Sequence, residues 1–421
     1  MDLSLAAARE RDAADGLAHL RARFHTREDE FYMDGNSLGL SSEDADTALT
    51  DAVAEWRDLA IRGWTDADPD WFHYGERLGA RTAPLVGAAP EAVVVANSTT
   101  VNIHTLIGTF LADNPGKIIV NDLDFPTDHY AIKSQLRLRG LDPDDHLVSV
   151  ESRDGRTIDE ADIEAAIDDE TAIVFMPSVL YRSGQLLDVE RITEAAHDRG
   201  ALAGFDLAHS VGAVPHELSA WGVDFAVWCS YKYLNAGPGA IAGLYVNSKH
   251  FGTTPALAGW WGHDKATQFE MRHEFTSAES AGAWQIGTIP ILAAAPLDGS
   301  LSIFEETSIE AVREKSLALT DFLVALADAK LTDRGFAIGT PREHARRGGH
   351  IALEHAEAYR ISLALKERGV VVDFRPPNVV RVCPAPLYST FEDVWHVVEM
   401  LGEIVDDLAY ERFKLRQGGV T

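Results

Sequence analysis

The sequence contains very little cysteine and lysine. Of its 421 residues only nine are lysine and two are cysteine, Cys229 and Cys383. Both cysteines lie in apolar stretches, which predicts reduced, buried thiols and a cytoplasmic protein rather than a disulfide framework. No spacing of cysteine and histidine is typical of a metal site. No apolar segment is long enough to span a bilayer, and the N-terminus lacks the charged-then-apolar order of a secretion signal.

Positive charge is also scarce. The chain has 37 basic against 66 acidic residues, a formal net charge of −29. This balance argues against nucleic-acid binding, which needs a basic face. Acidic runs at 142–145 and 168–170 and the low lysine content predict a halophilic protein, because the Debye length falls to about 3 Å at 1 M salt and self-repulsion is screened. An acidic protein of an ordinary cytoplasm remains the alternative.

Among so few lysines, Lys232 has unusual surroundings. An apolar run at 223–229 predicts a buried strand, and breakers at Asn235 and 237–239 predict a turn before a second apolar strand at 240–246. A lysine at such a junction can lose solvation and act as an amine nucleophile toward a carbonyl. Considered alone, a lysine that caps a turn is the slightly better explanation of the pattern.

A carboxylate upstream favours the chemical explanation. Asp206 ends a small apolar strand 26 positions before Lys232, and His209 follows it. Pyridoxal phosphate needs a lysine amine for its Schiff base and a carboxylate against its ring nitrogen. That ion pair is worth roughly 4 kcal/mol at an effective dielectric constant near 20. An N-cap role for Asp206 is the alternative.

Two earlier segments fit the same cofactor. The strand at 93–96 leads to Ser98, Thr99 and Thr100 at a predicted helix start, where hydroxyls and free N–H groups can bind a phosphate. Plain helix-capping hydroxyls are the alternative. The strand at 118–122 leads to Phe125, which can stack on a planar heterocycle or simply pack in the core.

Alternating apolar strands and amphipathic helices between residues 92 and 246 predict an α/β fold with a mainly parallel sheet. The cofactor motifs fall at strand ends, where such sheets bind ligands. A long helix is predicted from Leu301 to about Ala327, followed by short strands and helices. We therefore expect an N-terminal segment, 1–50, that joins the small domain, a large cofactor-binding domain, 51–295, a smaller α+β C-terminal domain, 296–415, and a disordered tail, 416–421.

Eight blocks between residues 30 and 400 together resemble kynureninase. This is a family of fold-type I, aspartate aminotransferase-like, pyridoxal-phosphate enzymes related to the class V aminotransferases. Asp34-Gly-Asn-Ser-Leu-Gly39 and Gly259-Trp-Trp-Gly-His263 carry the resemblance most specifically. The blocks are 32–39, 99–102, 124–128, 204–209, 228–235, 259–263, 287–291 and 381–388.

The resemblance implies a role for each matching residue. Lys232 would form the Schiff base, Asp206 would pair with the ring nitrogen and Phe125 would stack on the ring. The remaining cofactor-site residues of this chain would be Thr99, Thr100, Pro126, Thr127, Asp128, His209 and Tyr231. Trp260 and Thr288 would reach the phosphate from the neighbouring subunit, which implies a homodimer.

On the substrate side, the resemblance implies that Arg381 clamps the substrate α-carboxylate through its guanidinium fork. Asn36 and Ser37 would also bind the substrate. Trp64 would stack on the substrate's aryl ring, although a core tryptophan at a helix end is equally consistent with its surroundings.

The implied reaction is hydrolytic Cβ–Cγ cleavage of L-kynurenine to anthranilate and L-alanine in tryptophan catabolism. Lys232, Tyr231 and Asp206 would be the catalytic residues, with Tyr231 as a proton donor. The Gly287-Thr288 pair favours kynurenine over its 3-hydroxy form. The family pattern shifts across 175–185, where Pro177 stands in place of an expected polar residue, and no role is assigned there.

Three other functions compete with this one. A class V aminotransferase would not need the 259–263 block. A cysteine desulfurase or selenocysteine lyase needs a mobile nucleophilic cysteine, whereas Cys229 precedes Lys232 in a predicted strand and Cys383 lies between Val382 and Pro384. A catalytically silent relative would not need Lys232, Asp206 and Arg381 together.

Overall fold

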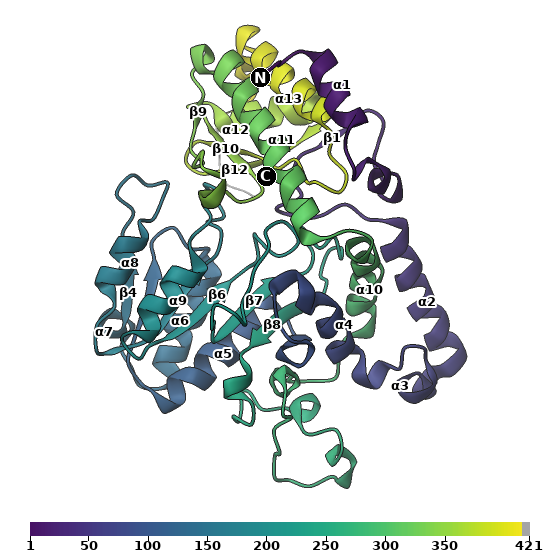
Figure 1. The fold of residues 1–421 in the computed structure, drawn as a ribbon, viewed down its shortest axis with the longest axis vertical. Helices are drawn as coiled ribbons and strands as arrows, with labels where there is room; N and C mark the ends of the chain where they lie inside the picture. The colour runs from purple at the N-terminus through teal and green to yellow at the C-terminus, as the bar shows by residue number, and fades with distance from the viewer. Residues whose placement is uncertain (415–421) are drawn as a thin grey trace.

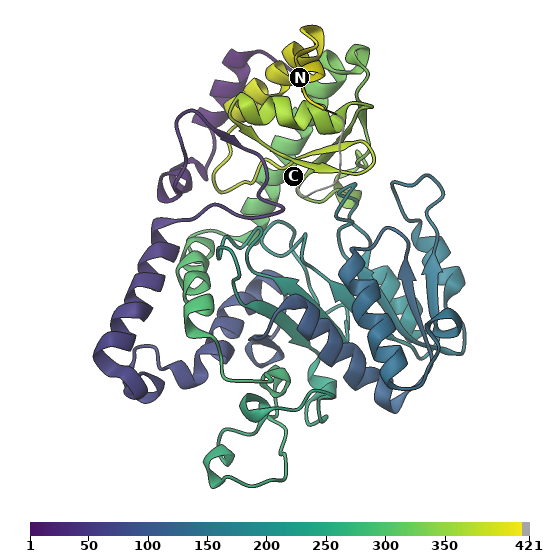
Figure 2. The ribbon, with the colours of Figure 1, turned by 180° about the vertical axis from the view of Figure 1, so that it is seen from behind.

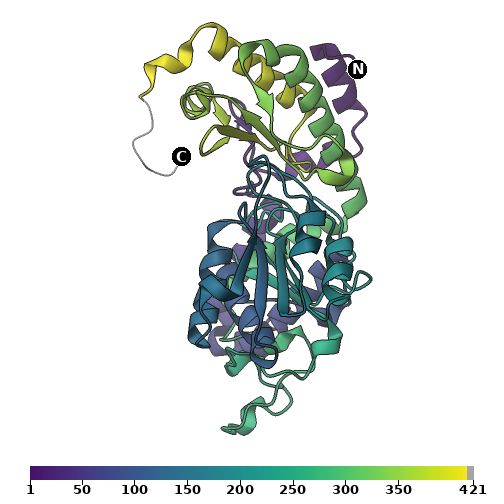
Figure 3. The same cartoon turned by 90° about the vertical axis from the view of Figure 1, so that its left-hand side faces the viewer.

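The computed structural model describes residues 1–414, so the tail predicted at 416–421 lies outside the described residues. The chain forms a large body, drawn mainly in blue and teal, and a smaller one that combines green, yellow and purple segments (Figure 1). The views from behind and from the side show the N-terminal helix against the C-terminal elements (Figures 2 and 3). Among the described residues, no helix is long and apolar enough to cross a membrane.

A seven-stranded sheet forms the centre of the large body. Strands β7, β6, β5, β3 and β4 are parallel, whereas β8 runs antiparallel to both of its neighbours, β7 and β2. This confirms the predicted α/β class with a mainly parallel sheet. In sheet order the strands are β2 (Val93–Val95), β8 (Ala242–Val246), β7 (Phe225–Cys229), β6 (Leu202–Asp206), β5 (Thr171–Pro177), β3 (Lys117–Asn121) and β4 (Leu147–Val150).

The central strands are mostly apolar because helices cover both faces of the sheet. Every residue of β5 is buried, as expected for a parallel strand between two helical layers. Gly204 of β6 leaves room for the ring of Phe225 on β7, since a Cβ there would lie 2.2 Å from that ring. Full burial of one such aromatic side chain contributes about 1.5–3 kcal/mol.

The helices of the large body form two layers. Helices α5 (Thr99–Asp113) and α6 (Pro126–Leu138) share an apolar cluster with Phe175 and Phe225 on one face. Helices α8 (Glu160–Ala166) and α9 (Val189–His197) pack against Val174 and Phe205 on the other. The remaining helices are α2 (Glu43–Leu59), α3 (Gly63–Asp66), α4 (Tyr74–Thr82), α7 (Pro143–His146) and α10 (Ile291–Glu305).

The smaller body contains an antiparallel four-stranded sheet covered by helices. Its strands, in sheet order, are β12 (Asp373–Arg375), β13 (Val379–Val382), β10 (Ile351–Glu354) and β9 (Ala337–Ile338). Its helices are α11 (Ile309–Lys330), α12 (Ala358–Glu367) and α13 (Phe391–Asp406).

The N-terminal segment contacts both bodies. Helix α1 (Leu5–Ala13) packs on α13, and β1 (Phe31–Tyr32) pairs in parallel with β11 (Val370–Val371). Helix α2, in contrast, packs on α10. Asp12 of α1 also accepts hydrogen bonds from the backbone N–H groups of Phe391 and Glu392 at 2.7 and 2.9 Å. Residues 1–32 thus associate with the smaller body, while the predicted domain limits remain predictions.

One predicted element is wrong. The single helix expected from Leu301 to about Ala327 is two helices, α10 and α11, separated at residues 306–308. Ser308 begins the second helix, because its hydroxyl accepts the backbone N–H of Ala311 at 3.2 Å. Residues 305–308 are all polar, and the helical apolar pattern resumes at Ile309, so reading the two patterns as one helix overlooked the capping serine.

Candidate cofactor and substrate site

The carboxyl ends of the parallel strands open into a cavity of about 260 Å³. Residues from the N-terminal segment, the large body and the smaller body meet there. It is lined by Asn36, Ser37, Thr99, Thr100, Phe125, Thr127, Tyr181, Asp206, Ala208, His209, Cys229, Tyr231, Lys232, Arg375 and Arg381.

Lys232 follows β7 and points its amine toward His209, with Nζ 2.9 Å from His209 Nε2. The turn after it depends on Asn235, whose backbone is left-handed at φ 55°. Gly39 of the N-terminal segment donates its N–H to Tyr231 O at 2.8 Å. A Cβ on Gly39 would lie 2.4 Å from Lys232 O, so only glycine permits this approach.

Asp206 ends β6 and lines the cavity, and two further buried carboxyl groups, those of Asp124 and Asp128, lie close enough to interact with it. Its Oδ1 accepts the backbone N–H of Ala208 at 2.7 Å, and neither oxygen of Asp128 has a hydrogen-bond partner within residues 1–414. Burial raises the pKa of Asp206, Asp128 and Asp124, and the negative charge of Asp206 raises the pKa of the other two further. The nearby amine of Lys232 opposes this shift for Asp206 and Asp128. A second cation, such as a protonated ring nitrogen, therefore fits this end of the cavity.

The opposite chemistry occurs at the start of α5. Ser98 is its N-cap residue but makes no side-chain cap hydrogen bond, and the hydroxyls of Thr100 and Thr127 lie 2.9 Å apart. Burial, followed by the charge of Lys232, lowers the pKa of His209 well below its usual value, and its Nδ1 has no partner among the described residues. A helix N-terminus with free N–H groups and hydroxyls attracts an anion such as a phosphate. The alternative prediction, a hydroxyl that simply caps the helix, is not observed for Ser98, because its side chain makes no cap hydrogen bond.

Phe125 lies at the N-terminus of α6 and is 43% exposed. Its ring meets that of Tyr181 edge-on, with centroids 5.3 Å apart and an interplanar angle of 89°. A ring this open at a cavity wall is available for stacking on a planar ligand. Core packing, the other interpretation of Phe125, does not account for that exposure.

Arg381 lies on β13 at the far end of the cavity and is almost fully buried. Its Nε and Nη2 donate to the two oxygens of Asp373, each at 2.6 Å. Nη2 also donates to Ser37 Oγ at 2.8 Å, and Nη1 donates to Tyr181 O at 2.7 Å. The cavity lining thus contains the carboxylate of Asp206 and, at what we call the arginine end, the guanidinium groups of Arg375 and Arg381.

Not every residue predicted for the site lines the cavity. Pro126 is the first residue of α6, and Asp128 lies buried behind the wall. Trp260 and Thr288 are exposed and line no part of this chain's own cavity. Trp64 packs against Trp71 and Trp261, with ring centroids 5.6 and 5.3 Å away, instead of lining the cavity.

Sequence reasoning missed four lining residues: Tyr181, Ala208, Cys229 and Arg375. Tyr181 falls in the segment 175–185, where no role was assigned. Arg375 could have been predicted from the sequence, because Asp373 and Arg375 lie on the same face of a strand that precedes a Pro-Pro-Asn turn. The resulting hairpin brings Asp373 opposite Arg381.

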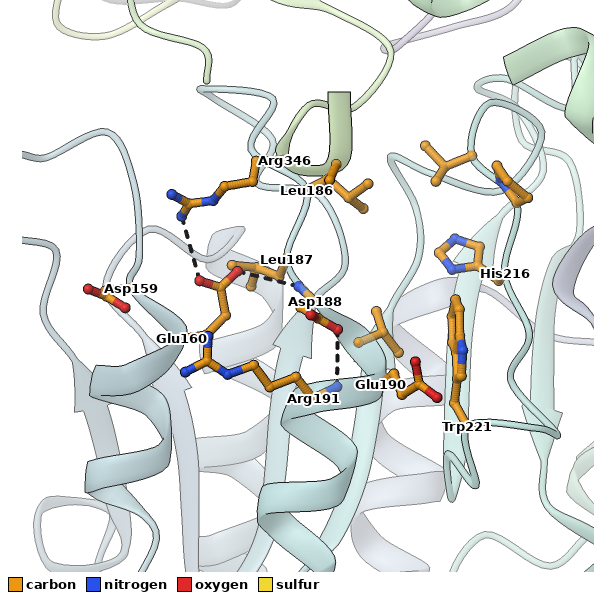
Figure 4. Close-up of a pocket in the computed structure, with 14 residues that line it drawn as sticks. Asp159, Glu160, Leu186, Leu187, Asp188, Glu190, Arg191, His216, Trp221 and Arg346 are labelled. Atoms are coloured by element: carbon orange, nitrogen blue, oxygen red, sulfur yellow. Dashed lines mark hydrogen bonds and ion pairs between the residues drawn. The ribbon is translucent and has the colours of Figure 1, made fainter. Parts of the chain in front are cut away.

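A second cavity, of about 460 Å³, lies between the start of α9 and the turn His344–Arg346 of the smaller body (Figure 4). It contains no lysine, so it cannot form a Schiff base with a cofactor. Its guanidinium groups are paired, Arg191 with Glu164 and Arg346 with Glu160 at 3.5 Å. His216 on its wall lies 2.8 Å from Ser210 Oγ and supports the turn that carries His209.

Comparison with known proteins agrees with this chemistry. A family model described as the kynureninase C-terminal domain matches residues 312–401. The kynureninase of Geobacillus thermodenitrificans is 51% identical over 415 residues, which cover 98% of this chain and 97% of that protein.

Solved structures with a similar fold are more distant in sequence. An apo cysteine desulfurase from Thermococcus onnurineus has a TM-score of 0.78 at 19% identity, covering 92% of this chain and 98% of that one. A mutant of C-DES with glycine covalently linked to its PLP cofactor also gives 0.78, at 15% identity, covering 91% and 99%. These likenesses show the fold of the pyridoxal-phosphate enzymes of type I. Together with the close full-length relative, they establish that the chain belongs to the kynureninase family.

Proposed function

We propose that this chain hydrolyses L-kynurenine to anthranilate and L-alanine with pyridoxal 5′-phosphate as its cofactor. The observation that carries the proposal is one cavity that contains Lys232, Asp206 and the open N-terminus of α5. Lysine amine, carboxylate and phosphate cradle are the three protein contributions that this cofactor requires. The kynureninase relative, similar over nearly the whole chain, identifies the substrate.

The residues of the cavity have separable tasks. Bound pyridoxal phosphate supplies an electron-withdrawing ring conjugated to the substrate nitrogen. Asp206 keeps the ring nitrogen protonated, while Thr99, Thr100 and His209 hold the phosphate. Lys232 would hold the cofactor through its Nζ, and as a free amine, once the substrate has taken its place, it would move the proton of the substrate Cα. The neutral His209 beside Nζ leaves the amine free to exchange a proton.

Tyr231 is suited to donate a proton during the cleavage. Burial, followed by the neighbouring thiol of Cys229, raises the pKa of its phenol. The phenol therefore keeps its proton at neutral pH, and because the raised pKa makes it a weaker acid than a free phenol, the proposed donor role rests on its position. Its position next to Lys232 places this acid at the cofactor cavity.

The functional unit is a homodimer in which Trp260 and Thr288 complete the partner's cofactor site. Support comes from the exposure of both residues and from their distance from this chain's own cavity lining. Trp260 lies beside Phe269, with Met271 close in sequence, and all three are exposed. Such an apolar patch on a projecting segment favours burial in a subunit interface (Figure 1).

The remaining assignments concern the enzyme's setting. A preference for kynurenine over 3-hydroxykynurenine is supported by the Gly287-Thr288 pair, and the reaction belongs to tryptophan catabolism. A cytoplasmic location is supported by the two free, buried cysteines. A halophilic origin is supported by the net charge of −29.

Cysteine desulfurases share this fold, but the cysteines of this chain do not suit that reaction. Both Cys229 and Cys383 are buried, and burial raises the pKa of both thiols, that of Cys383 to about 12. A desulfurase nucleophile must be a mobile, readily ionised thiol. Neither cysteine meets that requirement.

The proposal is tested by adding L-kynurenine to the purified, cofactor-loaded protein at low and high salt. Anthranilate is followed by its fluorescence and alanine by an independent assay. We expect the two products in equal amounts, with at least a thousandfold loss in Lys232→Ala and none in Lys366→Ala, an exposed lysine on α12. A protein that binds the cofactor yet releases no anthranilate in any salt would have a different class V activity.

A further inference from the structure

The donors of Arg381 are already in use within the protein. A guanidinium has five N–H groups. Three of those in Arg381 go to Asp373 and Ser37, and a fourth goes to Tyr181 O. With the Asn36 amide turned so that both of its ends are satisfied, its oxygen accepts from Arg381 Nη1 at 3.2 Å. A substrate carboxylate can therefore reach Arg381 only by replacing one of these partners.

A second guanidinium in the same cavity has one donor without a partner in the described part of the chain. Arg375 stands two residues after Asp373 on β12 and lines the cavity with Arg381. Its Nη2 lies 2.5 Å from Asp373 Oδ2, while its Nε is buried without a hydrogen-bond partner in the described part of the chain. A buried donor without a partner is destabilising, so a ligand that accepts a hydrogen bond from it is favoured.

Tyr181 connects this guanidinium to the cofactor end of the cavity. The guanidinium carbon of Arg375 lies 6.0 Å from the centre of the Tyr181 ring, whose other contact is Phe125. The same residue holds Arg381 through its backbone oxygen. Arg375, Arg381 and the ring-stacking Phe125 thus surround the space where an amino acid attached to the cofactor would extend.

The local charge balance also suits one carboxylate. Arg375 and Arg381 face two acids, Asp373 and Asp34. Burial, then the charge of Asp373, raises the pKa of Asp34 to about 6. A bound carboxylate would favour the protonated form of Asp34 further, leaving two arginines opposite Asp373 and the ligand.

We propose that Arg375 is a second contact for the α-carboxylate of the amino-acid substrate, which it shares with Arg381. Asp373 holds both guanidinium groups in position, and Ser37 and Asn36 give way to the ligand at Arg381. This inference rests on the proposed function, because it takes the substrate to be an amino acid bound at the cofactor.

The test uses the full-length, cofactor-loaded protein and its Arg375→Gln variant. L-Alanine has the α-carboxylate but no aryl group, and its binding is measured by titrating the visible spectrum of the bound cofactor. We expect its dissociation constant to rise tenfold or more in Arg375→Gln, and the KM for L-kynurenine to rise in parallel while kcat changes less. Arg375→Lys, which retains the charge, should lose less affinity than Arg375→Gln.

Arg182→Gln is the matched control. This neighbouring arginine binds Gly155 O and Asn378 at 2.9 and 3.2 Å but does not line the cavity, so its replacement should leave alanine binding within twofold. Should Arg375→Gln and Arg375→Lys both bind alanine like the wild type while the KM for kynurenine rises, Arg375 contacts the aryl end and the inference fails. A wild-type spectrum that does not respond to alanine would overturn it as well.

The alanine titration separates this inference from the proposed reaction. If the protein binds alanine through Arg375 but does not cleave kynurenine, the carboxylate contact is supported and the proposed substrate is wrong. If the protein cleaves kynurenine but Arg375→Gln binds alanine as the wild type does, the proposed function is supported and the Arg375 contact is wrong.

Discussion

Individual side chains of the cavity have charge states that depend on burial. Three carboxyl groups, Asp124, Asp128 and Asp206, share one buried corner in which their pKa values rise. His209 is held neutral in the same cavity. A cofactor with a cationic ring nitrogen and an anionic phosphate complements this pattern. The ring nitrogen would lie beside the carboxyl groups, and the phosphate would lie on the side of the neutral His209.

Replacing the phenol of Tyr231 should separate binding from catalysis. Tyr231→Phe removes the acidic hydroxyl but keeps the ring, so we expect kcat to fall about 10²–10⁴-fold with the cofactor still bound. Steady-state kinetics with L-kynurenine and the visible spectrum of the holoenzyme measure the two effects. Tyr130→Phe, at an exposed tyrosine of α6, is the control. Unchanged turnover in Tyr231→Phe would remove Tyr231 from the mechanism.

At this scale, the sequence reveals residues that belong to a local motif and hides those that meet only in space. Lys232 and Asp206 could be predicted because each follows a buried strand, and their spacing matches a known chemistry. The part played by Arg375 depends on a hairpin whose register aligns Asp373 with Arg381. Trp64 packs with two other tryptophans, as its alternative interpretation expects, so its contact with the substrate stays a prediction.

At the scale of helices and strands, Asp224 connects several elements at the end of the parallel strands that lies opposite the cavity. This residue directly precedes β7 and is fully buried. It accepts the backbone N–H of Ala203 on β6 at 2.8 Å, and each of its oxygens lies 2.8 Å from the Nε2 of one histidine, His197 or His250. Lys249 adds an ion pair at 2.6 Å. One carboxylate thus joins β6, β7, α9 and the segment after β8.

The stabilisation from Asp224 should depend on pH. Hydrogen bonds from His250, Lys249 and His197 outweigh burial and lower the pKa of Asp224 from 3.8 to about 2. Since the folded value lies below the unfolded one, the stabilisation is complete above pH 4 and is lost as the pH falls toward 2. The lowered pKa corresponds to about 2 kcal/mol at neutral pH.

Urea unfolding of Asp224→Asn and wild type at several pH values tests this. We expect the difference in free energy of unfolding to be largest at neutral pH and to shrink below pH 4. Asp198→Asn, at an exposed residue that follows α9, should match the wild type throughout. A difference that stays constant down to pH 2 would contradict the role of the ionised carboxylate.

The sequence predicts the presence of an element with a continuous apolar pattern better than it predicts the residues at which that element begins and ends. The parallel strands were found because they are apolar on both faces. The division of α10 from α11 is not predicted because only four polar residues, 305–308, separate two segments with a helical apolar pattern. Caps made by distant residues, such as Asp12 at the start of α13, cannot be found from local sequence.

The whole molecule has two properties that no single element explains: a cavity built from three parts of the chain and a very acidic composition. The N-terminal segment, the large body and the smaller body each contribute to the cavity lining. Movement between the two bodies would therefore change the distance between the cofactor end and the arginine end. The sequence predicted the contributing segments, whereas only the fold shows how Ser37 and Arg381 meet.

The acidic composition predicts how stability responds to salt. With a net charge of −29, repulsion within the folded protein should weaken as salt is added, because the Debye length falls from about 10 Å at 0.1 M to about 3 Å at 1 M. We expect the melting temperature to rise between 0.1 M and several molar KCl. A parallel series in sucrose controls for solute effects other than screening. A melting temperature that stays flat or falls in KCl would rule out adaptation to high salt.

The central claim is that Lys232 holds pyridoxal phosphate opposite Asp206. It is tested most directly by reducing the holoenzyme with borohydride, digesting it and locating the cofactor's added mass on the peptides by mass spectrometry. We predict that, of the nine lysines, Lys232 alone carries the mass, and that Lys232→Ala carries none. Attachment to another lysine, or an unchanged adduct in Lys232→Ala, would contradict the site described above.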